Sequence, residues 1–563
     1  MKRTALLMLL LAGCAVVYGT VLARTETARI WVFFQGRPYL RSGNLPSPRW
    51  AGFSAGAVQR REARGAVPWS ESDFPVDPRY LLAVRSAGAE VIRESRWLNA
   101  VSVRCDSACR SRLSSLPFIT GIRGVATYHR PLERIEPDFS AVRAESPAAA
   151  APPLKYGSSR DQLVQLKVPV AHQNGFAGQG EIVAIFDAGF RKDHIAFKNH
   201  VIVAEHDYVF DDGNVSNDID TDSHGTSTWS CVGGSVPGTL YGPAYQAKFI
   251  LAATEDIRSE TIVEEDNWVA AFEWADRLGA TVISCSLGYS DWYAPSDFDG
   301  TTALTSRVAS TAAKKGIVVV NSAGNSGPLP STLNAPADAV NILAVGAVAG
   351  SGVIAGFSSQ GPTADGRLKP EVVARGVATF VATSSSTASF GRSSGTSFSC
   401  PLTAGFSAVL LSAHPDWNPL QVREAVMMTA SRKDSPDNTY GYGIPDMALA
   451  LDYLPLASVV IDHKPLKDTS NVSQPYNVTA RIRAQRGLNR SQLFLFWKRE
   501  GAGGFSKAPL TPVPGVADTF QASIPAQSHG ATLLYYLSAK DTRGKASKVP
   551  YRAPQNLYNF KVR

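Results

Sequence analysis

Short apolar runs alternate with helical patterns through the middle of this chain, and this alternation restricts its fold more than any other feature. Runs of strand length occupy residues 182–186, 281–284, 317–320 and 342–345. Helical spacing of apolar residues covers 268–278. A later helix is predicted to begin with Asn418 as its N-cap and Pro419 as its first residue, and Gln421 completes the capping box. Because strands without polar alternation are buried on both faces, the pattern predicts an α/β fold with a doubly wound, mainly parallel sheet.

Ser397 lies between a glycine-bearing turn and an apolar helical pattern, in the sequence Gly-Thr-Ser-Phe-Ser of residues 395–399. At a helix N-terminus the unpaired backbone N–H groups and the positive end of the dipole favour a developing negative charge. Serine is also a common N-cap residue, so this position alone does not assign it a reaction. A serine nucleophile further needs a base, a carboxylate that orients the base, and donors to the oxyanion.

Three residues upstream of Ser397 fit those needs. Asp187 follows the apolar run at 182–186, and sites in open α/β sheets collect at such strand ends. His224 stands at the start of a short helical stretch and is the candidate base. Asn325, in a Gly-Asn-Ser-Gly sequence after a predicted strand, is the candidate oxyanion donor. Taken singly, the histidine would be structural and the Gly-Asn sequence would be a turn.

In chain order, Asp187, His224, Asn325 and Ser397 resemble the catalytic layout of the subtilisin-like serine proteases. The resemblance extends over about residues 162–454, through further glycine-bearing motifs. It implies a triad in which the serine attacks a peptide carbonyl, the histidine takes its proton and the aspartate holds the imidazole. It implies a side-chain oxyanion donor in the asparagine.

The resemblance also implies a substrate-binding surface. Ser286, Leu287 and Gly288 are similar to the family's edge strand, which pairs with an extended substrate, and Gly324 is expected to contact the substrate beside the oxyanion candidate. Ala188 departs from the family pattern, because the family usually has Thr or Ser there. The Thr or Ser side chain of the family supports a turn and takes no part in proton transfer. Its replacement therefore does not affect the role of the preceding aspartate.

The implied function is a serine endopeptidase that cleaves extended peptides through an acyl-enzyme on Ser397 and needs no cofactor for its chemistry. The alternative is a catalytically silent exported protein that keeps the fold and binds a surface. Such a protein would be free to lose any of the four catalytic positions, and all four are present. A serine esterase of the α/β-hydrolase type would need a Gly-x-Ser-x-Gly elbow ahead of its acid and histidine, whereas Ser397 comes last.

Residues 1–23 have the composition of a secretory signal peptide. Positive charges near the start precede an apolar run over residues 5–17, and Val-Leu-Ala at 21–23 favours cleavage there. A lipobox-like Leu-Ala-Gly-Cys sequence offers the alternative of a lipidated Cys14. The sequence predicts a secreted or cell-surface bacterial protein. No membrane span is expected after signal removal, because no later run of about 18 apolar residues is apparent.

Residues 24–153 are predicted to form a propeptide and linker. Strand-like runs occur at 28–34 and 97–103, and alanine and proline dominate the end of the segment, a composition open to proteolysis. In subtilisin-like precursors this position is held by a propeptide that assists folding and then blocks the cleft. An unrelated N-terminal domain is the alternative. Maturation is expected between Val125 and Tyr156.

The predicted peptidase domain, residues 154–455, gives way to a β-rich segment at 456–563. Alternating runs such as 476–482 and 493–497 predict a small sandwich of about 100 residues, resembling immunoglobulin or fibronectin type III modules. No catalytic pattern occurs in it. Binding of a polymer or cell surface, stabilisation of the peptidase and a role in secretion are all open for this module.

An acidic segment of the peptidase domain has two interpretations. Oxygen ligands clustered in a loop suit calcium, which often stabilises subtilisin-like enzymes, although the spacing does not fit an EF-hand. The alternative is a solvated acidic loop beside the cleft that favours basic substrate residues. The candidate ligands are Asp211, Asp212, Asn214, Asp218, Asp220 and Asp222. The net charge of +8 is spread over the chain without a basic and aromatic strip, which argues against a nucleic-acid partner.

Six cysteines are few for an exported protein of this length, so the hydrophobic core must supply most of the stability. Cys105 and Cys109 are close enough in sequence to form a disulfide. Cys231, Cys285 and Cys400 adjoin catalytic motifs, and we interpret them as buried apolar fillers.

Overall fold

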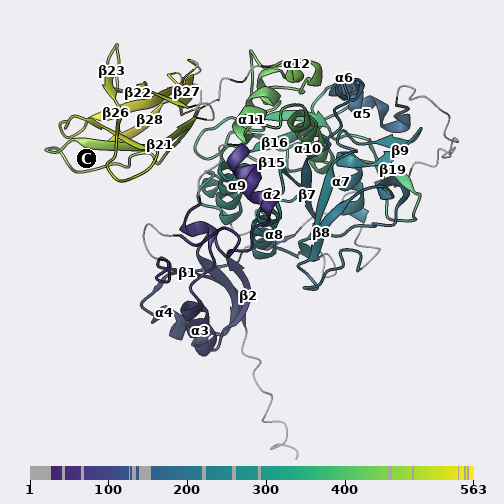
Figure 1. The fold of residues 1–563 in the computed structure, drawn as a ribbon, viewed down its shortest axis with the longest axis horizontal. Helices are drawn as coiled ribbons and strands as arrows, with labels where there is room; N and C mark the ends of the chain where they lie inside the picture. Colours follow the sequence, from purple (N-terminus) through teal and green to yellow (C-terminus); the bar gives the residue numbers. More distant parts are fainter. Residues whose placement is uncertain are drawn as a thin grey trace, which may run out of the picture. The chain divides into compact units, whose positions relative to one another are not determined.

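The chain folds into two compact units, shown along the chain in Figure 1. The first combines Met1–Leu45 with Glu71–Val125, and the second combines Pro46–Ser70 with Ala126–Arg563. The predicted signal peptide lies outside the described residues. The computed structural model describes residues 27–563 apart from 41–44, 65–68, 126, 130–134, 138–153, 218–222, 257–261, 290–292, 454, 456–458, 485–486, 543, 545, 551–552 and 555–556.

The first unit is a four-stranded antiparallel sheet with two α-helices packed against its strands. The strand order is β2 (Glu90–Ser95), β3 (Ala100–Cys105), β1 (Ala28–Phe34), β4 (Ile119–Gly124), and the helices are α3 (Pro78–Ser86) and α4 (Ser107–Ser114). Val32 shares a buried core with Val84 of α3 and Leu113 of α4. The strand predicted at 97–103 begins only at Ala100, because the Asn99 N–H closes a turn on the Arg96 carbonyl.

The second unit contains a seven-stranded sheet whose strands are all parallel. Three of its central strands are buried along their whole length, which is why their sequences show no polar alternation. The predicted doubly wound sheet is therefore confirmed. The strand order is β17 (Val372–Arg375), β16 (Leu343–Val348), β15 (Val318–Ser322), β14 (Val282–Cys285), β7 (Ile182–Asp187), β11 (Lys248–Ala253), β8 (Ile202–Asp207).

Helices cover both faces of this sheet. Val183 and Ile185 of β7 share a core cluster with Trp229 of α7 (Ser223–Gly233). The Phe186 ring lies 5.0 Å from that of Phe272 in α8 (Glu265–Leu278). Because neighbouring side chains of a strand point to opposite faces, α7 and α8 lie on opposite sides of the sheet. Besides α10, which is described below, the other α-helices among the described residues of this unit are α2 (Ala55–Ala63), α5 (Arg160–Gln165), α6 (Val168–Gln173), α9 (Leu304–Lys314), α11 (Pro419–Met428) and α12 (Met447–Leu451).

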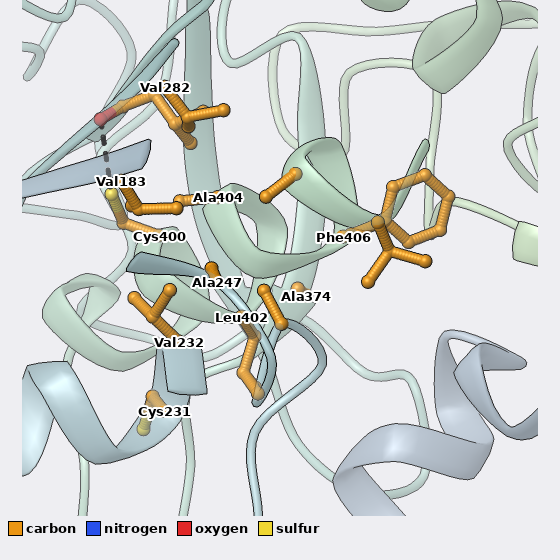
Figure 2. Packing of buried hydrophobic residues seen from close by; sticks show 14 of the residues in the cluster. Val183, Cys231, Val232, Ala247, Val282, Ala374, Cys400, Leu402, Ala404 and Phe406 are labelled. Atoms are coloured by element: carbon orange, nitrogen blue, oxygen red, sulfur yellow. Dashed lines mark hydrogen bonds between the residues drawn. The ribbon is translucent and has the colours of Figure 1, made fainter. Parts of the chain in front are cut away.

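Helix α10 (Thr396–Ala413) is a core helix packed against the seven-stranded sheet. Figure 2 shows Cys400, Leu402 and Ala404 of this helix packed among side chains of the sheet and of α7. Its mean hydropathy of 1.2 and its length of 18 residues also suit a membrane span, but 89% of it is buried inside the protein. We therefore treat it as a core helix, and among the described residues no other helix meets that length and hydropathy.

The C-terminal part of the second unit is antiparallel β structure in two sheets that share one core. This agrees with the β-rich module expected there. Its resemblance to a particular module family stays a prediction. One sheet has the order β20 (Val459–His463), β21 (Tyr476–Ala484), β25 (Thr519–Ile524), β24 (Thr511–Pro512). The other has the order β23 (Ser506–Pro509), β22 (Leu488–Arg499), β26 (Thr532–Asp541), β27 (Ala546–Val549), with β28 (Tyr558–Lys561) also on β26.

Candidate active site

A buried aspartate and a histidine meet at the carboxyl end of β7. Asp187 is fully buried, and its Oδ1 lies 2.6 Å from Nδ1 of His224. A carboxylate can only accept, so His224 donates through Nδ1–H, and its Nε2 is left with a lone pair that can take a proton. Nδ1 and Nε2 therefore have the roles that a general base held by an aspartate requires.

Further hydrogen bonds fix the carboxylate of Asp187. The Ala188 N–H donates to Oδ1 at 2.9 Å, and the Thr228 hydroxyl donates to Oδ2 at 2.9 Å. The threonine was not predicted from the sequence. It follows His224 by four residues in α7, so both side chains lie on the same helix face, and this spacing is a signal that could have found it.

The helix that carries His224 needs the glycine that follows it. A Cβ on Gly225 would lie 2.0 Å from the Gly189 carbonyl oxygen, so only glycine lets α7 approach the turn after β7 this closely. This close approach holds His224 beside Asp187.

Ser397 is the second residue of α10 and is 2% exposed. The residue after it, Phe398, places its ring 5.8 Å from the His224 ring, so the start of α10 lies beside the histidine. Pro401 has no N–H to bond the Ser397 carbonyl one turn earlier. The Ser286 hydroxyl donates to that carbonyl instead, at 2.9 Å, and so supports the first turn of α10.

Asn325 is held by the residue that precedes the serine. The Thr396 N–H and the Thr396 hydroxyl each donate to Oδ1 of Asn325 at 2.9 Å. Because Oδ1 must accept these two bonds, the amide is oriented so that Nδ2 is its donor side. The Gly324 N–H donates to the same threonine hydroxyl at 3.3 Å. Gly324 has φ of +108°, a conformation in which a Cβ would be strained.

Residues 286–288 follow β14 without continuing it as a strand. Leu287 is buried, and its carbonyl accepts from Nδ2 of Asn321 at 3.1 Å. A Cβ on Gly288 would lie 2.1 Å from the Asn334 side chain, so the segment packs closely. The pairing of this segment with an extended substrate stays a prediction.

Two short strands of the N-terminal segment pair with strands of the second unit that lie outside the seven-stranded sheet. β5 (Thr127–His129) is antiparallel to β13 (Ile262–Glu264), which joins β12 (Glu255–Asp256). β6 (Ile135–Pro137) is antiparallel to β19 (Phe390–Ser393), which joins β18 (Thr379–Ala382). Since α10 begins at Thr396, the second pairing ends three residues before the helix that carries Ser397. The backbone of the N-terminal segment is thus bound beside that helix.

Calcium binding by the acidic segment stays a prediction. Asn217 donates through Nδ2 to Asp207 and to both carboxylate oxygens of Asp212, and the Asn214 N–H also donates to Asp212. N–H groups thus already occupy these carboxylates. No group of three or more acidic, histidine or cysteine side chains suited to a metal occurs among the described residues. The candidates Asp218, Asp220 and Asp222 lie outside them.

The cysteines near the site are buried thiols. Cys231, Cys285 and Cys400 are all fully buried and free, as interpreted from the sequence. Burial raises the pKa of Cys400 to about 12, which keeps its thiol protonated. Cys105 and Cys109 of the first unit are also free thiols, so the disulfide considered for them is not formed.

These features are typical of a serine peptidase built on a parallel α/β sheet. The chain belongs to the subtilase family, whose model matches residues 178–443. A second model, the Peptidase S8 propeptide domain of Bacteroidota, matches residues 29–138 and confirms the predicted propeptide.

Relatives support this membership. Subtilisin of Bacillus pumilus is 31% identical over 298 residues, which are 51% of this chain and 97% of that protein. The subtilisin-like protease PopC of Myxococcus xanthus is 30% identical over 321 residues, 52% of this chain and 66% of PopC. The crystal structure of fervidolysin from Fervidobacterium pennivorans, a keratinolytic enzyme related to subtilisin, matches with a TM-score of 0.56 at 19% identity. The match covers 96% of this chain and 74% of the fervidolysin chain, and it supports the fold.

Proposed function

We propose that this subtilase is an exported endopeptidase in which Asp187, His224 and Ser397 form the catalytic triad. The observation that carries the proposal is the 2.6 Å contact between Nδ1 of His224 and the buried carboxylate of Asp187. This contact leaves Nε2 as the only ring nitrogen able to take a proton. The Phe398 ring beside the imidazole supports the assignment of the neighbouring serine to the same site.

In the proposed reaction, the Ser397 hydroxyl oxygen attacks the carbonyl carbon of the scissile peptide bond while Nε2 of His224 takes its proton. The oxyanion accepts from Nδ2 of Asn325. The histidine then gives the proton to the leaving amine, which leaves an acyl-enzyme on the serine. A water molecule, activated by the same histidine, hydrolyses the ester and restores the hydroxyl. Apart from the substrate and the water, every group in these steps is part of the chain, so the proposal includes no cofactor.

Replacing Asn325 with alanine is expected to lower kcat by about 10²–10³ with little change in KM, because the oxyanion forms only after the substrate has bound. The measurement is steady-state hydrolysis of a chromogenic peptide by the mature protein. The matched control is Asn471→Ala in the C-terminal module, where the asparagine only orders its own turn. Equal activity of Asn325→Ala and the control would remove Asn325 from the oxyanion site.

We further propose that the precursor cuts itself within the range 125–156. Two strand pairings support this proposal, that of 127–129 with β13 and that of 135–137 with β19. They bind the N-terminal backbone in extended form just before and just after residues 130–134. Intact mass and N-terminal sequencing are expected to show a new N-terminus in that range for the unmutated chain. The Ser397→Ala chain is expected to stay uncut. Cutting at the same place in both chains would assign maturation to another protease.

Export is proposed from the predicted signal peptide, and lipidation at Cys14 is the alternative form of it. In a bacterial host, the protein is expected in the medium or at the cell surface, with residues 1–23 removed. Labelling with radioactive palmitate distinguishes the two forms. Only the lipoprotein takes up the label, and the Cys14→Ser variant of that lipoprotein does not. A chain that keeps residues 1–23 and stays in the cytosol would refute the proposed export.

A further inference from the structure

A short stretch inside the N-terminal segment belongs structurally to the peptidase. The chain leaves the first unit after Leu45, contributes Pro46–Ser70 to the second unit, and returns to the first at Glu71. This stretch carries helix α2, which Ser54 caps by accepting from the Ala57 N–H. Its last turn and C-cap contain Arg60, Arg61 and Arg64.

The three arginines are buried against acidic residues of the peptidase, each no more than 5% exposed. Arg60 and Arg61 bind the two carboxylate oxygens of Asp276, which is itself fully buried, with Arg61 at 2.5 Å from Oδ2. Arg64 pairs with Glu181 at 2.9 Å. A guanidinium forms such charge-assisted bonds with fixed geometry, so the contact is specific for arginine.

Backbone carbonyls complete the contact. The Ser54 N–H donates to the Arg277 carbonyl at 2.8 Å, and the Ser54 hydroxyl donates to the Leu278 carbonyl at 3.1 Å. Arg60 donates to the Ala280 carbonyl at 2.5 Å. These carbonyls lie at the end of α8 and just beyond it, where a helix has no partners of its own and favours positive charge.

Aromatic rings and a glycine shape the same contact. The Arg61 guanidinium lies 4.9 Å from the centroid of the Phe53 ring and 4.2 Å from that of Trp69, so it is bound by cation–π contacts as well as by Asp276. A Cβ on Gly279 would lie 3.2 Å from the Ala57 nitrogen, so the absence of a side chain there lets α2 approach the end of α8.

Charge complementarity is strong enough to keep the acidic partner ionised. Burial opposes ionisation of Asp276, but the charges of Arg61, Arg60 and Lys315 outweigh it and lower the pKa of that carboxyl. The acidic partners fit a cationic helix and would be costly to leave buried without one.

The contact is distant from the candidate active site. Glu181 directly precedes β7, whereas Asp187 ends it, so the two carboxylates are separated by six residues of extended chain, or about 20 Å. The end of α8 and the beginning of β14 lie at the same amino edge of the sheet. Binding at this edge does not require the candidate active site.

We propose that Asp276 and Glu181, with the carbonyls at the end of α8, form a docking surface for an arginine-bearing helix. Its occupant is residues 46–70 of this chain, and α2 stays on that surface after the link to the peptidase has been cut. The N-terminal fragment is therefore bound at two separate places, the amino edge of the sheet and the strands β13 and β19.

The test uses the full chain with Ser397→Ala and a recognition sequence for a sequence-specific protease placed within residues 144–151. Because an added protease cuts the chain, the test does not depend on self-processing. It therefore remains valid even if the proposed function is wrong. After cutting, the fragment is expected to co-elute with the peptidase on size exclusion. Its rate of release after dilution is then followed by intact mass.

Arg64→Glu and Glu181→Arg are each expected to speed release at least tenfold, because each leaves a buried charge facing a like charge. The double variant, which exchanges the two charges, is expected to return release to within threefold of the parent chain. The matched control is Arg104→Glu. Arg104 pairs with Glu90 at 2.8 Å on the exposed surface of the first unit, so release is expected to be unchanged.

Immediate loss of the fragment from the parent chain would overturn the proposal, as would equal release from Arg64→Glu and the parent. Failure of the double variant to recover would show that the pair is not a direct contact. Should Arg64→Glu fail to fold by circular dichroism, Arg64→Met keeps the apolar stem and is expected to speed release tenfold as well. Unchanged release from a folded Arg64→Met chain would then overturn the proposal.

Discussion

Ser397→Ala is expected to lower kcat by about 10⁶ with KM nearly unchanged, the order found when the corresponding serine of subtilisin is removed. The methyl group keeps the start of α10 intact but offers no oxygen to the carbonyl carbon. Peptide hydrolysis is measured after the N-terminal segment has been cut by an added specific protease, since the variant is not expected to cut itself.

The control for this variant is Ser407→Ala in the same helix. Ser407 is also buried, and its hydroxyl donates to the Thr403 carbonyl at 2.9 Å within α10. It is expected to keep nearly full activity, which would show that removal of a helix hydroxyl is not itself damaging. Substantial activity in a folded Ser397→Ala protein would contradict the assigned nucleophile.

Asp187→Asn is expected to lower kcat by about 10⁴. The carboxylate accepts from Nδ1 of His224, from the Ala188 N–H and from the Thr228 hydroxyl, so it has acceptors for three donors. An asparagine amide in the same place retains a single acceptor oxygen. The ring is then expected to turn to the tautomer with hydrogen on Nε2, which cannot take the serine proton.

Asp193→Asn is the matched control for that change. Asp193 is six residues further on, is 66% exposed at its side chain, and pairs with Arg191 at 3.2 Å. It is expected to leave kcat within twofold, because a surface ion pair contributes little. A comparable loss in both variants would mean that general charge, and not the contact with His224, accounts for the effect.

The strand pattern was sufficient to predict the sheet. The apolar runs at 281–284, 317–320 and 342–345 fall on β14, β15 and β16, which are buried on both faces and so carry no competing polar signal. The triad candidates were identified because each lies in a short local motif. Asp187 and His224 do meet, across 37 residues of sequence, at the end of β7.

Contacts that depend on tertiary structure were not predictable in this way. The Ser286 hydroxyl supports the Ser397 carbonyl over 111 residues, and only the geometry of Pro401 in α10 explains why that carbonyl needs a donor. Arg60 and Arg64 have the spacing of an exposed helix face. Their partners are 216 and 117 residues away, so the sequence gives no sign that they are buried.

The most direct test of the account is to identify the atom that a fluorophosphonate modifies. The unmutated protein is labelled, digested and mapped by tandem mass spectrometry beside Ser397→Ala and Ser407→Ala. We expect a single adduct on Ser397 in the unmutated and Ser407→Ala proteins, and none in folded Ser397→Ala. An adduct on another residue, or the absence of any adduct from a folded and processed protein, would contradict the proposed mechanism.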